Sequence, residues 1–357
     1  MVVAAAAIAV ALAVLELGVR LVTAFDRNYL DALVNRPPSS ATRRLTLADL
    51  VRPSDDDRIV YELRPGVRGT FLGREVSVNR LGMRDDERGG DKPPGTVRIV
   101  GLGDSHMFGW GVDRREAFLA VLEEMLRERR PGRRFEAWNL AVPGYNSVQE
   151  VRTLERRMDA IDPDLVIISF IDNDMHLPNF LARRPDFWTL RRSYLAQLIR
   201  RRLATARGER LRPLDLSIMA PGEQRRPERE LGRERFPERF WPLFGWKNLE
   251  QAYRRLAAVS RERRIPAIVV FVGTDPPDAE SVRTLKALAA EEGIVSVDPR
   301  ERILAYLRET GRKADRLVLS RRDPHANPQL HRLIAEAIFD TIVERGLLPP
   351  APGPPAK

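Results

Sequence analysis

From residue 97 to residue 345 the chain alternates short apolar segments with amphipathic ones. Short apolar stretches rich in β-branched residues predict buried strands, and apolar residues spaced three and four apart predict helices. Strands connected through helices pair in parallel, so the pattern predicts an α/β fold with a five-stranded, mainly parallel, doubly wound sheet. The predicted strands are Val97–Leu102, Phe135–Leu140, Leu165–Ile171, Ala267–Val272 and Ile294–Val297, and the predicted helices are Glu116–Arg127, Val148–Met158, Asn248–Val259, Ala279–Ala290 and Pro328–Arg345.

The composition excludes several classes of protein. The chain contains no cysteine, which rules out a disulfide scaffold, a cysteine nucleophile and a thiolate zinc site. The net charge is +10, and the basic residues are almost all arginine, a bias typical of a GC-rich genome. Because no module interleaves basic and aromatic residues, we predict no nucleic-acid partner. The histidines lack metal-ligand spacing such as HExxH, so no metal is predicted.

The apolar sequence of residues 1–25 predicts a membrane helix that acts as a signal anchor. An unbroken apolar run covers residues 1–15, and Glu16 and Arg20 interrupt it at helical spacing before it resumes. A cleaved signal peptide and a buried helix are the alternatives. Arg20 and Arg27 follow the run, which by the positive-inside rule alone would leave the body of the chain in the cytoplasm. Long domains cross membranes largely regardless of such charges, so we expect the domain on the exported, periplasmic or extracellular side.

Composition along the rest of the chain predicts four further segments. Residues 26–95 are rich in Pro, Arg and Asp and predict a spacer with a small flap, whose strands are expected at Ile59–Leu63 and Glu75–Asn79. The main domain is expected over 96–348. Within it, residues 176–245 are rich in arginine and proline and predict a solvated insertion or a lid over the site. The proline-rich tail 349–357 is expected to be disordered.

Small and polar residues follow the first three predicted strands, where active sites form in open α/β sheets. Residues 103–105 read Gly-Asp-Ser, Gly144 follows the second strand, and residues 172–174 read Asp-Asn-Asp. A serine on a strand-to-helix turn lies close to backbone N–H groups that can stabilise an oxyanion. Each feature taken alone also fits a helix cap, a loop glycine or an ordinary turn.

An aspartate and a histidine lie close together near the C-terminus, in the sequence Asp323-Pro324-His325. A carboxylate in this position can hold Nδ1 of the imidazole and leave Nε2 free to act as a base. The alternative is a capping aspartate beside a surface histidine. The chain order serine, aspartate, histidine fits a hydrolase triad assembled across an α/β sheet.

Four short motifs in fixed order resemble the blocks of the SGNH (GDSL-type) hydrolase superfamily over roughly residues 97–346. The stretches VSVNRLGMR (76–84) and VRIVGLGDSHMFGWG (97–111) are similar to a bacterial, N-terminally anchored subgroup. His106 stands where the GDSL nickname has Leu, and we interpret it as a tolerated variant. The four motifs are Ser105 in GDS, Gly144 in NLAVPG, Asn173 in DND and His325 in DPH.

The resemblance implies a flavodoxin-like three-layer α/β/α sandwich that needs no metal or organic cofactor. It implies that Ser105 is the nucleophile, that His325 is the general base and then the acid, and that Asp323 orients His325. The backbone N–H groups of Ser105 and Gly144 and the side chain of Asn173 would form the oxyanion hole. Asp104 and Asp174 would lie next to these catalytic and oxyanion-hole residues and help to hold them in position.

The leading hypothesis is a membrane-anchored serine esterase that hydrolyses an O-acyl ester of an envelope carbohydrate or a lipid through an acyl-enzyme. An O-acyltransferase that modifies an envelope or extracellular polysaccharide would use the same residues, with a sugar hydroxyl in place of water. A catalytically inactive envelope interaction protein is the third hypothesis. The residues do not distinguish hydrolysis from transfer, because both proceed through the same intermediate.

Overall fold

The central feature of the fold is a five-stranded sheet in the order β11-β10-β7-β5-β6, with every neighbouring pair parallel. The predicted α/β fold with a parallel sheet is therefore confirmed. The strands are β5 (Thr96–Leu102), β6 (Arg134–Asn139), β7 (Leu165–Phe170), β10 (Ala267–Phe271) and β11 (Val295–Val297). The computed structural model describes residues 2–25, 44–89, 91–178, 180–182, 193, 195–196, 198–199, 203, 216–218, 238–272 and 279–350.

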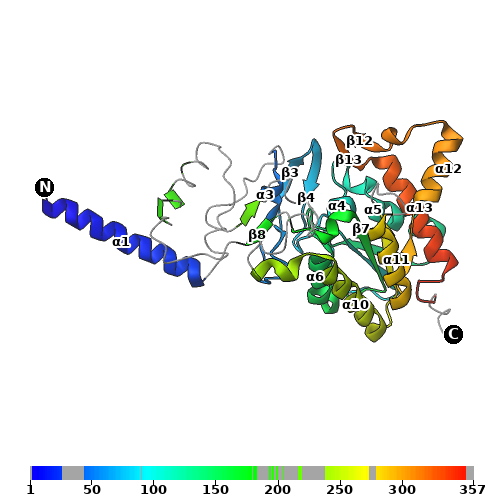
Figure 1. Cartoon of the computed structure of the whole chain (residues 1–357), viewed down its shortest axis with the longest axis horizontal. Coiled ribbons are helices and arrows are strands. Elements are labelled where there is room, and N and C mark those ends of the chain that lie inside the picture. The colour runs from blue at the N-terminus through cyan, green and yellow to red at the C-terminus, as the bar shows by residue number, and fades with distance from the viewer. Residues whose placement is uncertain are drawn as a thin grey trace.

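Helices cover both faces of the sheet (Figure 1) because successive strand side chains point to opposite faces. Val97 and Ile99 of β5 lie in one apolar core with residues of α5 and α13. Val100 and Leu102 of the same strand lie in a second core with residues of α6, α10 and α11. The result is the three-layer α/β/α sandwich that was expected. The helices are α5 (Phe118–Arg129), α6 (Ser147–Ile161), α10 (Trp246–Arg263), α11 (Glu280–Glu292) and α13 (Pro328–Glu344).

The prediction missed two helices and two strands of the sandwich domain. The four-residue helix α4 (Ser105–Phe108) follows β5, and α12 (Arg300–Thr310) follows β11 without a fully buried side chain. The strands β12 (Val318–Ser320) and β13 (Asp323–Ala326) form an antiparallel hairpin before α13. The DPH motif therefore lies in a short strand that precedes α13. Short 3-10 helices cover Arg114–Glu116, Asp172–Met175, Glu238–Leu243 and Ala314–Arg316.

Residues 44–89 form two small antiparallel pairs rather than the two strands expected. β2 pairs with the unexpected strand β1, and β3 with β4. Side chains of this segment, including Tyr61, Phe71 and Val76, lie in the same apolar core as β5 and α13. The segment is thus packed onto one face of the sandwich. Its elements are α3 (Leu47–Leu50), β1 (Val51–Pro53), β2 (Tyr61–Leu63), β3 (Arg68–Phe71) and β4 (Arg74–Ser77).

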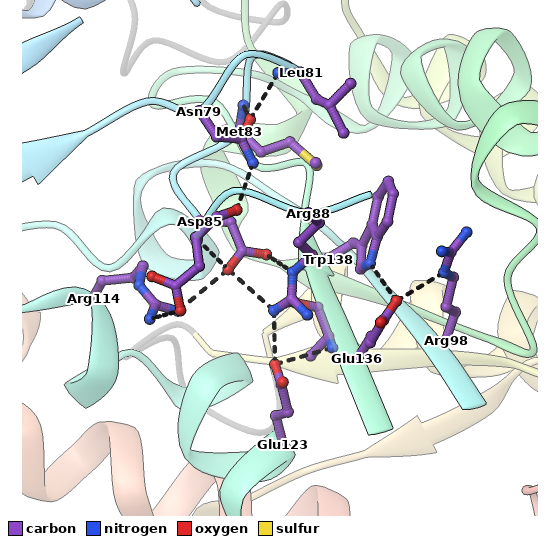
Figure 2. A network of polar contacts seen from close by, with 12 residues as sticks. Asn79, Leu81, Met83, Asp85, Arg88, Arg98, Arg114, Glu123, Glu136 and Trp138 are labelled. Carbon is purple, nitrogen blue, oxygen red and sulfur yellow. Dashed lines mark hydrogen bonds and ion pairs between the residues drawn. The ribbon is translucent and has the colours of Figure 1, made fainter. Parts of the chain in front are cut away.

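Charged side chains connect the end of this segment to the sandwich (Figure 2). Arg88 donates to Asp85 at 2.9 Å and to Glu123 of α5 at 3.0 Å, and Arg114 donates to Asp85 at 3.2 Å. Burial raises the pKa of Asp85 although both arginines oppose that shift. Because these groups are largely desolvated, losing one partner would leave an uncompensated charge.

The first helix, α1 (Val2–Phe25), is long and apolar enough to cross a membrane between Val3 and Leu21. It lies away from the sheet in Figure 1, with most of its side chains exposed. By length and composition it fits either an anchor or a signal sequence. Most of the predicted insertion at 176–245 and residues 351–357 lie outside the described part; within the insertion β8 (Phe180–Ala182) pairs with β9 (Leu216–Ile218).

One buried histidine of α13 predicts how stability depends on pH. His331 is 1% exposed, and its Nδ1 accepts the Phe118 N–H at 3.2 Å. Burial lowers the pKa of His331 to about 3. The unfolded chain binds a proton at this side chain below about pH 6.5, whereas the folded chain does not. The stability that depends on neutral His331 is therefore complete above about pH 6.5 and is lost as the pH falls towards 3.

We expect His331→Gln to reduce the acid slope of the unfolding free energy by about 1.4 kcal/mol per pH unit between pH 6 and 4. Urea unfolding of both proteins at several pH values measures this slope. Titrating carboxylates contribute equally to both proteins, so the difference isolates His331. Equal slopes would show that His331 does not carry the effect.

Candidate active site

The turn after β5 brings Ser105 to the carboxyl edge of the sheet. A Cβ on Gly103 would lie 2.2 Å from Ser169 Oγ of β7 and 2.5 Å from Met107 Cβ of α4, so no larger residue fits between strand and helix. Asp104 caps α4, because its Oδ1 accepts the His106 N–H at 2.9 Å. This tight turn places Ser105 at the first position of α4.

The structure brings Ser105 and His325 together although 220 residues separate them. Ser105 Oγ lies 2.8 Å from His325 Nε2, and His325 Nδ1 lies 2.6 Å from Asp323 Oδ1. Since a carboxylate faces Nδ1, that nitrogen carries the proton and Nε2 is left to accept the serine hydroxyl. Burial raises the pKa of Asp323, but hydrogen bonds from His325 outweigh it and leave the pKa below its usual range. The arrangement can move a proton from Ser105 to His325.

Asn173 lies beside Ser105 on the neighbouring strand end. It belongs to the 3-10 helix that follows β7, and its Nδ2 donates to Asp104 Oδ2 at 3.1 Å. The Ser105 hydroxyl is 3.3 Å from the same oxygen. Asp104 therefore joins the ends of β5 and β7, because Ser105 and the side-chain amide of Asn173 contact the same carboxylate oxygen.

The loop after β6 runs alongside the same turn. Val142 N–H donates to Gly103 O at 3.1 Å, two residues before Gly144. Gly144 has φ +81°, a conformation that favours glycine. The structure thus brings the Gly144 loop to the Ser105 turn, although no hydrogen bond within the described part of the chain joins Gly144 to Ser105 itself.

Asp174 is buried behind Asn173 and holds the turn rather than facing Ser105. Its Oδ2 accepts the Ile171 N–H at 2.9 Å. Burial, followed by the nearby charge of Asp104, raises the pKa of Asp174 well above its ordinary value. Glu150 of α6 is also fully buried, and its pKa is raised by burial and by Asp174. The interior behind Asn173 therefore disfavours negative charge.

Two rings that the sequence prediction did not assign to the site lie against His325. The Trp110 ring stacks at 5.1 Å between centroids with an interplanar angle of 22°, and its Nε1 donates to Asp323 Oδ2 at 3.2 Å. The His106 ring lies at 4.8 Å, and burial lowers its pKa to about 4. The sequence signal for Trp110 was its place in the GWG that ends the first motif. Asp323 and His325, the partners of Trp110 at the site, are however more than 200 positions away.

The remaining histidines do not join the site. His176 is buried, and neither ring nitrogen has a hydrogen-bond partner in the described structure. His331 lies under α5 against Phe118. Within the described residues no group of three or more His, Cys, Asp or Glu side chains is placed to hold a metal ion.

Comparisons with known proteins identify the family of the chain. A search of curated proteins finds no match. Among solved structures the chain is similar to an acetyl xylan esterase, with 14% identity over 69% of this chain and 100% of that one and a TM-score of 0.40. It is also similar to the psychrotrophic esterase EstA from Pseudoalteromonas sp., with 12% identity over 70% of this chain and 97% of that one and a TM-score of 0.40. A family 3 carbohydrate esterase from Clostridium thermocellum is similar with 12% identity over 71% of this chain and 100% of that one, and a TM-score of 0.40. The family model of the GDSL-like lipase/acylhydrolases matches residues 102–333. That match spans more than half of the chain, from the end of β5 into α13, and shows that this protein, a serine ester hydrolase, belongs to the GDSL-like lipase/acylhydrolase family.

Proposed function

We propose that the protein is an esterase that cleaves an O-acyl ester through an acyl-enzyme on Ser105. The observation that carries the proposal is the chain of contacts from Ser105 Oγ to His325 Nε2 at 2.8 Å and from His325 Nδ1 to Asp323 Oδ1 at 2.6 Å. Serine is a weak nucleophile unless an adjacent base removes its proton. His325 is within hydrogen-bond reach to do so, and Asp323 stabilises the imidazolium that forms.

The first half of the reaction forms the acyl-enzyme. Ser105 Oγ attacks the ester carbonyl carbon while its proton passes to His325 Nε2. The tetrahedral oxyanion collapses, the bond to the leaving alkoxide breaks, and His325 returns its proton to the departing oxygen. In the second half His325 deprotonates a water molecule, which attacks the acyl group, and the proton then returns to Ser105.

The oxyanion in this mechanism accepts hydrogen bonds from the Ser105 N–H, the Gly144 N–H and the Asn173 side-chain amide. The Asp104 contacts support this assignment, because Asn173 and Ser105 both hydrogen-bond to the Asp104 carboxylate and therefore lie close together. The Gly144 loop supports it through the bond between Val142 and Gly103. Asp174 fixes the Asn173 turn through Ile171.

We propose that the substrate is an acyl ester of an envelope carbohydrate or of a lipid, and that α1 holds the domain at a membrane on the exported side. The exposed apolar surface of α1 supports the membrane contact. A sugar hydroxyl that replaced water would make the same site an acyltransferase. Supplying acyl esters with and without sugar acceptors, and measuring how much acyl group reaches each, separates the two reactions. A C-terminal reporter that works only outside the cytoplasm tests the placement.

Ser105 should react with a fluorophosphonate probe, and Ser105→Ala should abolish the labelling. His325→Ala should slow labelling and lower kcat for p-nitrophenyl acetate by several orders of magnitude, because the hydroxyl loses its base. His331→Ala is the matched control, since that histidine does not contact Ser105. Mass-spectrometric mapping of the label to another serine, or mild loss in His325→Ala beside severe loss in His331→Ala, would refute the assignment.

Asn173→Ala should lower kcat by about 10²–10³-fold, as the removal of one preorganised oxyanion donor does elsewhere. Fluorophosphonate labelling should slow but persist, and the free energy of unfolding should fall by no more than about 1–2 kcal/mol, because Asn173 is exposed. Asn173→Asp keeps the shape but replaces the N–H donor with a second carboxylate beside Asp104, so it should be at least as slow. Kinetics and melting curves measure both effects. Near wild-type kcat in Asn173→Ala would remove Asn173 from the oxyanion hole.

A further inference from the structure

Trp110 binds the part of Asp323 that His325 leaves free. The imidazole uses Asp323 Oδ1 at 2.6 Å, and the indole Nε1 donates to Oδ2 at 3.2 Å. The two donors together fix the plane of the carboxylate. A carboxylate held at both oxygens presents Oδ1 to His325 in one orientation, as supporting hydrogen bonds do around other preorganised sites.

The indole also limits how the imidazole can rotate. Its ring stacks on His325 with centroids 5.1 Å apart and an angle of 22° between the planes. Rotation of the imidazole out of this plane would break the stacking and move Nε2 away from Ser105 Oγ, which now lies 2.8 Å away. One side chain therefore contacts both the histidine and the aspartate of the site.

Trp110 itself lies in a glycine-rich loop that needs external support. Gly109 and Gly111 flank it with φ of +84° and +71°. Arg84 supplies the support by donating to the carbonyl oxygens of Phe108 at 2.9 Å, of Gly109 at 2.5 Å and of Val112 at 2.6 Å. These three carbonyls lie on both sides of Trp110 in the sequence. Arg84 is 2% exposed, so hydrogen bonds to the carbonyl groups of this loop replace those that its guanidinium would make to water.

The segment that carries Arg84 is fixed on both sides of it. Before Arg84, Asn79 Oδ1 accepts the N–H groups of Leu81 and Met83, each at 3.0 Å. After it, Asp85 and Arg88 belong to the network that reaches Glu123 of α5 (Figure 2). Earlier in the same segment, the Phe71 ring of β3 meets the Trp110 ring edge-on at 5.0 Å. The segment before the sandwich thus contacts both the loop and the indole.

We propose that Trp110 is a positioning residue for the catalytic base and that Arg84 holds Trp110 in place. Residues 68–88 then belong to the working unit of the enzyme although they precede the residues matched by the family model, 102–333. The proposal rests on the proposed function of Ser105, His325 and Asp323. It adds that the aspartate and histidine are held from outside the triad by an indole and a buried arginine.

Trp110→Phe tests the role of the indole N–H, because the substitution keeps an aromatic ring. With p-nitrophenyl acetate we expect kcat to fall by about ten- to hundredfold while KM changes little, the effect of losing one hydrogen bond to a charged group. Without the indole donor, the carboxylate holds the protonated imidazole more tightly. The acid limb of the kcat/KM profile should therefore move to higher pH.

Trp138→Phe is the matched control. Trp138 is buried, whereas Trp110 is half-buried, and the Trp138 Nε1 likewise donates to a carboxylate, that of Glu136 on β6, at 3.3 Å. This variant should lose stability with no change in the acid limb. Unchanged kcat and an unchanged acid limb in Trp110→Phe would overturn the proposal. An equal shift of the acid limb in Trp138→Phe would do the same. Full activity of Ser105→Ala would instead overturn the proposed function, so the two failures are distinguishable.

Arg84→Lys tests the support of the loop, since one ammonium group cannot match the fork that reaches three carbonyls. We expect kcat to fall and the acid limb to shift in the same direction as in Trp110→Phe. The double variant should be little slower than the slower single variant, because both act through the same indole. Fully additive losses would overturn the role of Arg84. If Arg84→Lys does not fold, Phe71→Leu, which removes the edge contact to Trp110, replaces it in the same cycle.

Discussion

The site depends on the close approach of α4 to β7, and that approach depends on Gly103 having no side chain. A Cβ there would lie 2.2 Å from Ser169 Oγ and 2.5 Å from Met107 Cβ. Because the helix begins so near the neighbouring strand, the Asp104 carboxylate can cap α4 through Oδ1 and bind Asn173 through Oδ2. One steric condition at the carboxyl edge of the sheet thus lets a single carboxylate join the ends of β5 and β7.

Burial shifts the pKa values of several ionisable groups at the site away from their charged forms. It lowers the pKa of His106 to about 4, which favours the neutral ring near pH 7, and it raises the pKa of Asp174 well above its ordinary value. Asp323 behaves oppositely, because hydrogen bonds from His325 and Trp110 favour its charged form despite burial. A negative carboxylate beside His325 suits a reaction that creates an imidazolium.

The sequence was sufficient to predict the strands of the sheet and to locate the four motifs, because strands and motifs are both visible as local patterns in the chain. Apolar runs such as Leu165–Phe170 are unambiguous buried strands, and Ser105, Asn173 and His325 follow or precede elements in a fixed order. The β12–β13 hairpin was missed because its strands have three and four residues and little apolar periodicity. Trp110 and Arg84 were missed for another reason. Their partners are distant in the sequence, and an arginine is ordinarily a surface residue.

Pre-steady-state hydrolysis of p-nitrophenyl acetate tests the central claim most directly, namely that Ser105 carries an acyl group released in a second step. If formation of the acyl-enzyme is faster than its hydrolysis, p-nitrophenol should appear as a burst of about one equivalent per chain before the steady rate. The intact mass during the burst should exceed that of the free chain by one acetyl group, carried on Ser105. Steady turnover of the wild-type chain with neither a burst nor an acetylated Ser105, together with equal turnover by Ser105→Ala, would contradict the account.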